Sequence, residues 1–167
     1  MSTLLRFLQF FSLGTWVGSI VFFGAVVAPG AFTVLSSRDQ AGALVGLVLG
    51  RLHLAGMVAG VIFLIVTAIV GRSPAALARP APLLVAAMIV LTFVSEYWVT
   101  GTMEGLRAQM ISKAGSLDAT PVSDALRVSF DRLHVISVRL EMAVLGCGVA
   151  ALGLLSRRGS SLGLVDT

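Results

Sequence analysis

Residues 44–70 read LVGLVLGRLHLAGMVAGVIFLIVTAIV, an apolar run in which Arg51 and His53 are the only ionisable residues. A helix needs roughly 20 apolar residues to cross the hydrocarbon core of a bilayer, so this run is long enough. It lacks the alternation of apolar and polar residues over about ten positions that is typical of a strand in a membrane barrel. The segment therefore predicts a transmembrane helix.

Three further apolar runs of comparable length lie at 8–27, 82–99 and 133–155. The 167-residue chain is 57% hydrophobic and 12% charged, with a mean hydropathy of +0.99, whereas a soluble domain has about 25% charged residues. We therefore expect an all-α fold, an integral membrane four-helix antiparallel bundle that forms a single transmembrane domain over 1–167. A short extramembrane helix and loop are expected between the third and fourth spans, within 101–132.

The positions of the basic residues predict the orientation in the membrane. The short loop at 71–81 and the Arg157-Arg158 pair carry basic residues without a carboxylate, which favours both termini on the cytoplasmic side. The simplest location is a bacterial inner (plasma) membrane. Because the basic residues are scattered over helix ends, they favour contact with membrane lipids over binding to nucleic acid.

Pro29-Gly30 is expected to end the first helix.

Ionisable residues within the spans are the candidate functional residues, because a charge at membrane depth is costly. At about 100° per residue, one set is predicted to face inward as a ligand or hydrogen-bond cluster. This set consists of His53, Glu96, His134, Glu141 and Asp131. A second set is predicted to face outward, toward lipid or a partner, and consists of Arg51, Arg132 and Arg139.

The depth of the inward set follows from the helical rise. At about 1.5 Å per residue from the boundary at Arg72, Pro80 and Arg157, Glu96 and Glu141 lie about 22–24 Å up, His53 about 28 Å and His134 about 34 Å. The hydrocarbon core is about 30 Å thick. We therefore expect the cluster in the outer third of the bundle.

The chemistry of the two histidines stays open. Asp131 can orient His134 as a carboxylate orients a ligand histidine, or His134 can simply be hydrogen-bonded at the membrane interface. Either His134 or His53 can ligate a tetrapyrrole of the haem or chlorophyll type. The difference in depth disfavours ligation of one iron by both.

The two glutamates add further alternatives. Together with the histidines they can bind iron, zinc or copper, although the sequence has no Glu-x-x-His pair as in di-iron bundles. Glu96 and Glu141 can share a proton or gate a cation, or each can accept a hydrogen bond from a neighbouring hydroxyl such as Thr92 or Ser137. The metal, if one is bound, is not identified by the sequence.

The motifs of soluble enzymes are absent from the sequence, which has no phosphate loop, Gly-x-Ser-x-Gly, Cys-x-x-Cys or His-Glu-x-x-His. We therefore expect a protein that is not an enzyme and has no catalytic residue. The favoured function is an accessory, stabilising subunit of a larger energy-transducing membrane complex, with other membrane subunits as partners, holding a tetrapyrrole pigment, haem or lipid. The alternative is a small-solute or metal-ion handler that uses the His/Glu cluster.

Glycines spaced by four, at 14/18 and 42/46, predict close helix packing.

The chain resembles the transmembrane-protein-205-like family, a group of small four-helix membrane proteins described as a domain of unknown function. The matching residues are Trp16-x-Gly18 with Phe22 and Phe32, Trp98 with Met103 and Leu106-Arg107, and Leu126-Arg127-x-x-Phe130-x-Arg132-x-His134-x-x-Ser137. The sequence departs from the family's pattern after Trp98 and at Gly50, where the family has Pro, and at Glu141, where it has an amide. His53 is not part of that pattern. The resemblance implies the fold and no agreed activity.

Overall fold

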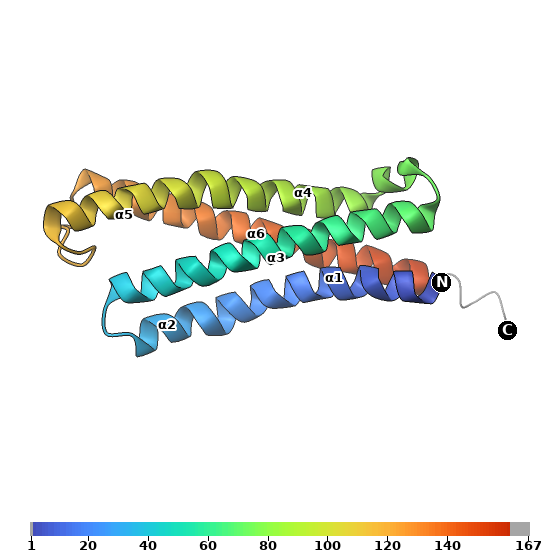
Figure 1. The fold of residues 1–167 in the computed structure, drawn as a ribbon, viewed down its shortest axis with the longest axis horizontal. Helices are drawn as coiled ribbons and strands as arrows, with labels where there is room; N and C mark the ends of the chain where they lie inside the picture. Colours follow the sequence, from blue (N-terminus) through green and yellow to red (C-terminus); the bar gives the residue numbers. More distant parts are fainter. Residues whose placement is uncertain (1, 161–167) are drawn as a thin grey trace.

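The computed structural model describes the backbone of residues 2–160 and the side chains of residues 3–157. Four long helical segments form an antiparallel bundle, and no strand occurs within the described residues (Figure 1). The elements in chain order are α1 (Ser2–Phe22), the π-helical turn η1 (Phe23–Val27), α2 (Ala28–Val34), α3 (Arg38–Gly71), the 3₁₀ helix η2 (Pro74–Ala78), α4 (Pro80–Val94), the π-helical turn η3 (Ser95–Thr100), α5 (Gly101–Ala114) and α6 (Ala125–Ser160). The all-α bundle predicted from the sequence is confirmed.

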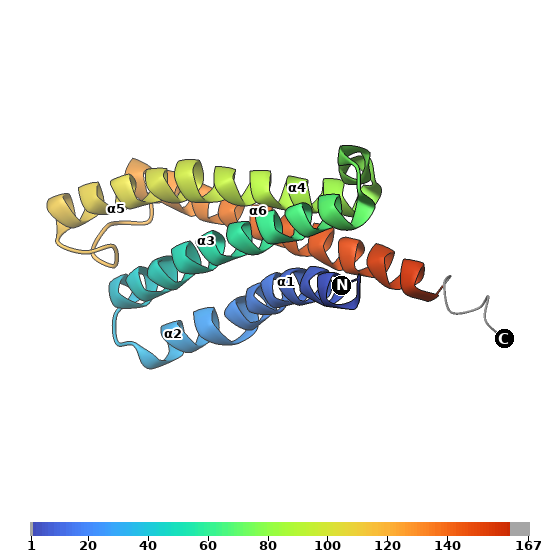
Figure 2. The same ribbon diagram turned by 45° about the vertical axis from the view of Figure 1, so that its right-hand side comes forward.

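Each of the four segments is long and apolar enough to cross a membrane. They run over Thr3–Val34, Arg38–Gly71, Pro80–Ala114 and Ala125–Arg157, and contain 32, 34, 35 and 33 residues. At about 1.5 Å per residue they are about 50 Å long, well beyond a hydrocarbon core of about 30 Å. The start of α1 and the end of α6 lie at the same end of the bundle (Figures 1 and 2).

The first segment does not end at Pro29-Gly30, so that prediction was wrong. Proline lacks an N–H and its ring clashes with the carbonyl of the residue four positions earlier. Here the π-helical turn Phe23–Val27 precedes the proline, and α2 continues to Val34. A π-helical turn changes the local hydrogen-bond register and so lets a helix absorb such a residue. The Thr33 hydroxyl donates to the carbonyl of Pro29, with 2.9 Å between the oxygens.

The first segment packs on α3 through one large side chain. Trp16 is 2% exposed, and its indole lies against the backbone of α3 at Gly56 and Gly60. A Cβ on Gly60 would lie 2.7 Å from Trp16 Cζ3, and one on Gly56 would overlap the pyrrole side of the indole. These two glycines therefore create the space that the tryptophan fills.

The glycine pairs singled out in the sequence do not mediate such contacts. A Cβ added at Gly14, Gly18 or Gly46 would meet nothing within 4 Å, and one at Gly42 would lie 3.8 Å from the Arg107 guanidinium. The prediction of close packing at these pairs was therefore wrong. Spacing by four places two glycines on one face, but it does not say whether a neighbouring helix occupies that face.

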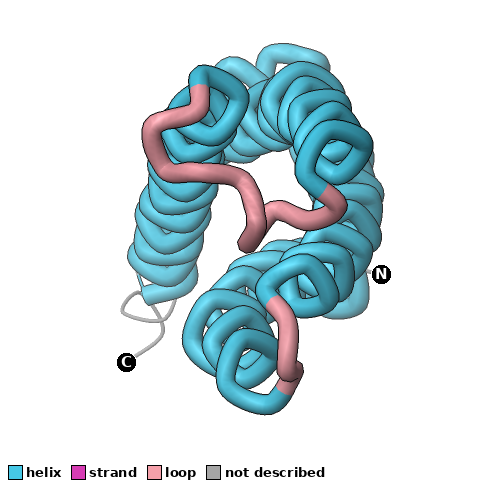
Figure 3. Tube along the Cα trace, turned by 90° about the vertical axis from the view of Figure 1, so that its left-hand side faces the viewer, coloured by secondary structure: helices cyan, strands magenta, loops and turns pink. Residues whose placement is uncertain are grey.

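The connection between the third and fourth segments closes the end of the bundle opposite the start of α1, which we call the outer end. The short helix predicted within 101–132 is α5. It continues the third segment without a break, and Gly115, at φ +81°, ends it in the left-handed conformation that favours glycine. The following loop crosses the end of the bundle to α6 (Figure 3). Asp124 precedes α6 and caps it, because Oδ1 accepts a hydrogen bond from the Leu126 N–H at 2.9 Å.

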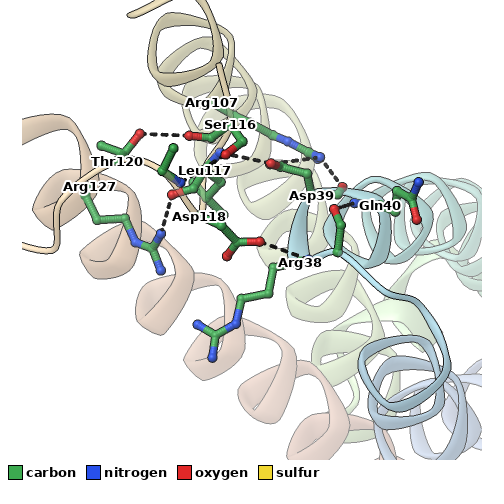
Figure 4. Close-up of polar contacts among 11 residues, drawn as sticks. Arg38, Asp39, Gln40, Arg107, Ser116, Leu117, Asp118, Thr120 and Arg127 are labelled. Atoms are coloured by element: carbon green, nitrogen blue, oxygen red, sulfur yellow. Dashed lines mark hydrogen bonds and ion pairs between the residues drawn. The ribbon is translucent and has the colours of Figure 1, made fainter. Parts of the chain in front are cut away.

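This loop is fastened to the start of α3 by polar contacts (Figure 4). Asp39 Oδ2 accepts from the Leu117 N–H at 2.9 Å, and the Arg107 guanidinium donates to the Asp39 carbonyl. Asp118 Oδ2 accepts from the Arg38 N–H at 3.3 Å. The extramembrane segment thus ties α3 and α5 together at the end where most of the acidic residues lie.

Candidate functional site

A buried histidine joins three segments of the bundle. His53, in α3, is 0% exposed. Its Nδ1 lies 2.7 Å from Oε2 of Glu96 in η3, and its Nε2 lies 3.1 Å from Oε2 of Glu141 in α6. Both distances are those of hydrogen bonds. We call these three side chains the Glu–His–Glu cluster.

The local backbone positions Glu96 for this contact. Glu96 belongs to the π-helical turn Ser95–Thr100, which interrupts the regular helix between α4 and α5. Such turns shift the direction of the residues that follow and often occur at functional sites. Opposite Glu96, α3 has Gly50, where a Cβ would lie 3.0 Å from Glu96 Oε1. A wider helical turn on one side and a missing side chain on the other make room for the carboxylate.

The two hydrogen bonds set the smallest number of protons that the cluster can hold, which is two. A neutral imidazole has one N–H and one acceptor nitrogen, and an ionised carboxylate only accepts. With two protons, both bonds can form in two ways. Either an imidazolium donates to two carboxylates, or a neutral imidazole donates to one carboxylate and accepts from the other in its protonated form. In both arrangements the three side chains together keep one uncompensated negative charge.

No arginine or lysine neutralises that charge within the described side chains. The ion pairs of Glu96 and Glu141 are those with His53. The side chain of Glu96 is 25% exposed and that of Glu141 17% exposed, so each carboxylate has one edge outside the protein interior. An excess negative charge is expensive in a low-dielectric interior, and an added cation would relieve the cost.

Glu96 opens into a cavity between α3 and the third segment. The cavity has a volume of about 580 Å³, and its lining includes Glu96, Gly50, Gly46 and Thr100 as well as Arg51. It continues toward the polar outer end, where Arg107 and Glu104 also line it. The cluster is therefore connected to the outer end of the bundle through Glu96.

Of the inward set predicted from the sequence, the structure brings together His53, Glu96 and Glu141. It does not bring in the other two. His134 is exposed on α6 and makes no hydrogen bond or ion pair within the described part of the chain. Asp131 does not orient it, because this carboxylate pairs with Arg127 at 3.3 Å, one turn earlier on the same helix. Asp131 is three residues from His134 and four from Arg127, so helical spacing allowed either pairing, and the opposite charge of the guanidinium favours Arg127.

The predicted depth of the cluster also needs correction. His53, Glu96 and Glu141 lie midway along their helical segments and not in the outer third of the bundle. The sequence estimate counted only the apolar windows. At about 1.5 Å per residue, the helices run on beyond these windows by about 9–12 Å in the first, second and fourth segments and by about 22 Å in the third. The three arginines predicted to face outward, Arg51, Arg132 and Arg139, are all exposed.

Comparison with known proteins assigns a family without assigning an activity. Residues 11–112 match the family model described as Domain of unknown function (DUF4149). The chain belongs to this family. No curated protein and no solved structure matches it. The matched region includes His53 and Glu96 and ends before Glu141.

In this DUF4149 protein the cluster is not arranged as a metal site. Nδ1 and Nε2 lie on opposite edges of the imidazole, so the two carboxylates cannot join one ring nitrogen around a single ion. Within residues 3–157, no group of three or more His, Cys, Asp or Glu side chains is placed to hold a metal ion. A tetrapyrrole iron on His53 would have to displace a carboxylate, since both ring nitrogens are engaged.

Sequence reasoning missed several polar residues of this family member. Thr92 and Ser95 are 0% exposed, and their hydroxyl oxygens have no hydrogen-bond partner among the described atoms. Thr92 was considered only as a partner of a glutamate, and Ser95 was not singled out, although it is adjacent to Glu96. Gln9 and Thr67, both buried, form a 2.8 Å hydrogen bond between α1 and α3. A polar residue inside an apolar run was the available signal in each case.

Proposed function

We propose that the protein is a non-enzymatic membrane protein that handles a small cation, in the simplest case a proton, at the Glu–His–Glu cluster. The observation that supports this most directly is the contact of both ring nitrogens of His53 with carboxylates from two other segments. With two shared protons the cluster keeps one negative charge, and a third proton or another small cation neutralises it. Ionisable groups at membrane depth are typical of such pathways.

The cavity beside Glu96 supports the same function, because a cation needs a route to the charge. Glu96 is the member of the cluster that lines this cavity, and Glu104 lines it nearer the outer end. Glu141 lies on the other edge of the imidazole ring. We propose that a proton enters at Glu96 and passes through the imidazole to Glu141, with the ring accepting at one nitrogen as it donates from the other.

Proteoliposomes provide the test. The purified protein is reconstituted with a pH-sensitive dye inside, and a potassium gradient with valinomycin drives cation entry. We expect acidification of the lumen with the wild type, a loss of at least tenfold in rate with His53→Gln or Glu96→Gln, and an unchanged rate with the control His134→Gln. Equal rates for wild type, His53→Gln and protein-free liposomes would overturn the proposal, and so would equal losses in all three variants.

A second function, the accessory subunit, is supported by the surface of α6 and η3. Arg132 and Arg139 are exposed and have no ion-pair partner within the described residues, and Trp98 is 71% exposed. We propose that these side chains contact lipid headgroups or another subunit of a larger energy-transducing complex. His134, whose ring is exposed, is the histidine of the two that can ligate a tetrapyrrole without losing a carboxylate contact. Mild-detergent purification tests both points, by co-migration with a large complex and by an optical spectrum.

Two finer assignments complete the proposal. We assign the chain to the transmembrane-protein-205-like group on the strength of its Leu126–Ser137 pattern, which lies outside the matched region. We also place both termini on the cytoplasmic side of a bacterial inner membrane. The basic residues Arg72, Arg79 and Arg157 support this orientation, since they lie at the end of the bundle where α1 begins and α6 ends.

A further inference from the structure

A second cavity lies between α3 and the first segment, on the opposite side of α3 from the cavity beside Glu96. Its volume is about 640 Å³. On α3 it is lined by small or aliphatic side chains, and on α1 and η1 mainly by aromatic and small ones. The residues that matter here are Arg51, Ala55, Gly56, Ala59, Trp16 and Phe22. Arg51 is the only charged residue in the lining, and no carboxylate takes part in it.

The buried indole of Trp16 provides a hydrogen-bond donor in this cavity. Trp16 is 2% exposed, and its Nε1 has no acceptor among the described atoms. A buried N–H without a partner is energetically costly, so a ligand that supplies an oxygen is favoured at this point. Trp16 and Gly56 both line the cavity, and the N–H lies against Gly56, so the donor lies next to the cavity and is covered by the protein in the absence of a ligand.

Arg51 is a free positive charge at the level of a headgroup. It is exposed and makes no hydrogen bond or ion pair within the described part of the chain. Along α3 it lies about 31 Å from Arg72, at about 1.5 Å per residue, which matches a hydrocarbon core of about 30 Å. When Arg72 lies at one membrane interface, the guanidinium of Arg51 therefore lies at the other.

The lining of α3 leads from this charge into the hydrocarbon region. Ala55, Gly56 and Ala59 follow Arg51 on one helical face in the direction of Arg72. They extend about 12 Å below Arg51, and the Trp16 donor at Gly56 lies about 7–8 Å below it. In a phospholipid, the ester carbonyls lie a few ångströms deeper than the phosphate, followed by the acyl chains. The cavity presents its groups in the matching order, with the positive charge of Arg51 first, then the Trp16 N–H donor, then the apolar channel along Ala55 and Ala59.

From this order we propose that the cavity between α1 and α3 binds one anionic phospholipid. The phosphate pairs with Arg51, an ester carbonyl accepts from the Trp16 indole N–H, and an acyl chain occupies the channel along Ala55 and Ala59. An anionic headgroup is favoured over a zwitterionic one, because the lining offers a positive charge and no carboxylate to a choline or ammonium group. Arg51 also lines the cavity beside Glu96, but the lipid site shares no residue with the Glu–His–Glu cluster and does not depend on its function.

Bromine quenching of tryptophan fluorescence tests the site. The chain has two tryptophans, so Trp98→Phe leaves Trp16 as the only one. This variant is reconstituted in phosphatidylcholine vesicles containing a low fraction of brominated phosphatidylglycerol or brominated phosphatidylcholine. We expect phosphatidylglycerol to quench Trp16 at about fivefold lower mole fraction, the scale set by one basic side chain at an anionic headgroup. Excess unbrominated phosphatidylglycerol should reverse the quenching.

Three further variants in the Trp98→Phe background separate a specific site from general lipid contact. Arg51→Gln should abolish the preference for phosphatidylglycerol, whereas Arg139→Gln, an exposed arginine outside the cavity, should keep it. Ala55→Phe, which fills the channel, should reduce quenching by both lipids. Equal quenching by the two lipids, or a preference that survives Arg51→Gln, would overturn the proposal and leave only annular lipid contact.

Discussion

The imidazole of His53 and the carboxylate of Glu96 come from different helical segments and lie 2.7 Å apart between Nδ1 and Oε2. The contact is possible because η3 widens the third segment at Glu96 and because α3 carries no side chain at Gly50. Glu141 completes the arrangement at the other ring nitrogen. One side chain thus links α3, η3 and α6 near the middle of the bundle, and its loss should affect both stability and function.

Replacing His53 with alanine should destabilise the protein far more than replacing His134. Breaking a buried charged contact leaves its partners uncompensated, which costs about 3–5 kcal/mol. Because both glutamates keep some exposure, we expect about 2–3 kcal/mol for His53→Ala, in the range of a lost buried hydrogen bond to a charged group. His134→Ala should stay within about 0.5 kcal/mol of wild type. Thermal unfolding in detergent measures both, and equal shifts would contradict the cluster.

The packing of Gly50 against Glu96 gives a second prediction. In Gly50→Ala, the new Cβ would lie 3.0 Å from Glu96 Oε1 and push the carboxylate away from His53. We expect slower cation entry in the proteoliposome assay. Gly105→Ala in α5 is the control, since a Cβ there meets nothing within 4 Å and Gly105 does not line the cavity beside Glu96. That control should keep full activity and gain stability by up to about 1 kcal/mol, the helix preference of alanine over glycine. Full activity in Gly50→Ala would count against a role for the contact.

Much of the cluster could be predicted from helical periodicity. The inward direction of His53, Glu96 and Glu141 followed from angles along regular helices, and those angles were sufficient for residues in long apolar runs. The same angles failed for His134. Near the outer end α6 has few neighbours, so a residue on the bundle-facing side can still be exposed. Periodicity gives a direction, but it does not say how far the neighbouring helices extend.

The π-helical turns were not predictable from the sequence. η1 lies just before Pro29, where the sequence suggested a helix end, and η3 contains no proline or glycine that would indicate an irregularity. Such turns depend on how three segments pack around one point, which no local pattern encodes. The same applies to Gly56 and Gly60. Their role depends on Trp16, about forty residues away in the chain, and not on their spacing.

The contact between Trp16 and α3 gives a third prediction. Gly56→Ala should destabilise the bundle, because the new Cβ would overlap the Trp16 indole. The indole is buried, so it cannot move away freely. Overpacking of this kind costs about 1–3 kcal/mol. Gly14→Ala in α1 is the control, since its Cβ has open space. Thermal unfolding and the emission maximum of Trp16 in the Trp98→Phe background should both shift for Gly56→Ala. An unchanged emission maximum would show that the indole does not lie against Gly56.

The predicted orientation can be tested by cysteine labelling. In a Cys147→Ala background, Ser36→Cys reports on the connection between α2 and α3, and Ala78→Cys reports on the end of η2. Both positions are exposed and lie at opposite ends of the bundle. In intact bacterial cells, a membrane-impermeant maleimide should label Ser36→Cys and should label Ala78→Cys only after lysis. The reverse pattern would invert the orientation, and labelling of both in intact cells would contradict the antiparallel arrangement.

The start of α6 should lose stability in acid. The Lys113 ammonium, 2.7 Å from Asp124 Oδ2, holds the pKa of this carboxyl below its usual value, and the hydrogen bond from the Leu126 N–H contributes in the same direction. A carboxyl with a lowered pKa in the folded state stabilises the fold above its unfolded pKa, and this contribution is lost as the pH falls through the folded pKa. Amide exchange at Leu126 and its neighbours should therefore lose protection relative to the middle of α6 as the pH falls below about 4, where a free Asp is about half protonated. Asp124→Asn keeps a capping oxygen that does not titrate, so its protection should vary less with pH. Parallel pH profiles for wild type and Asp124→Asn would mean that another group controls the start of this helix.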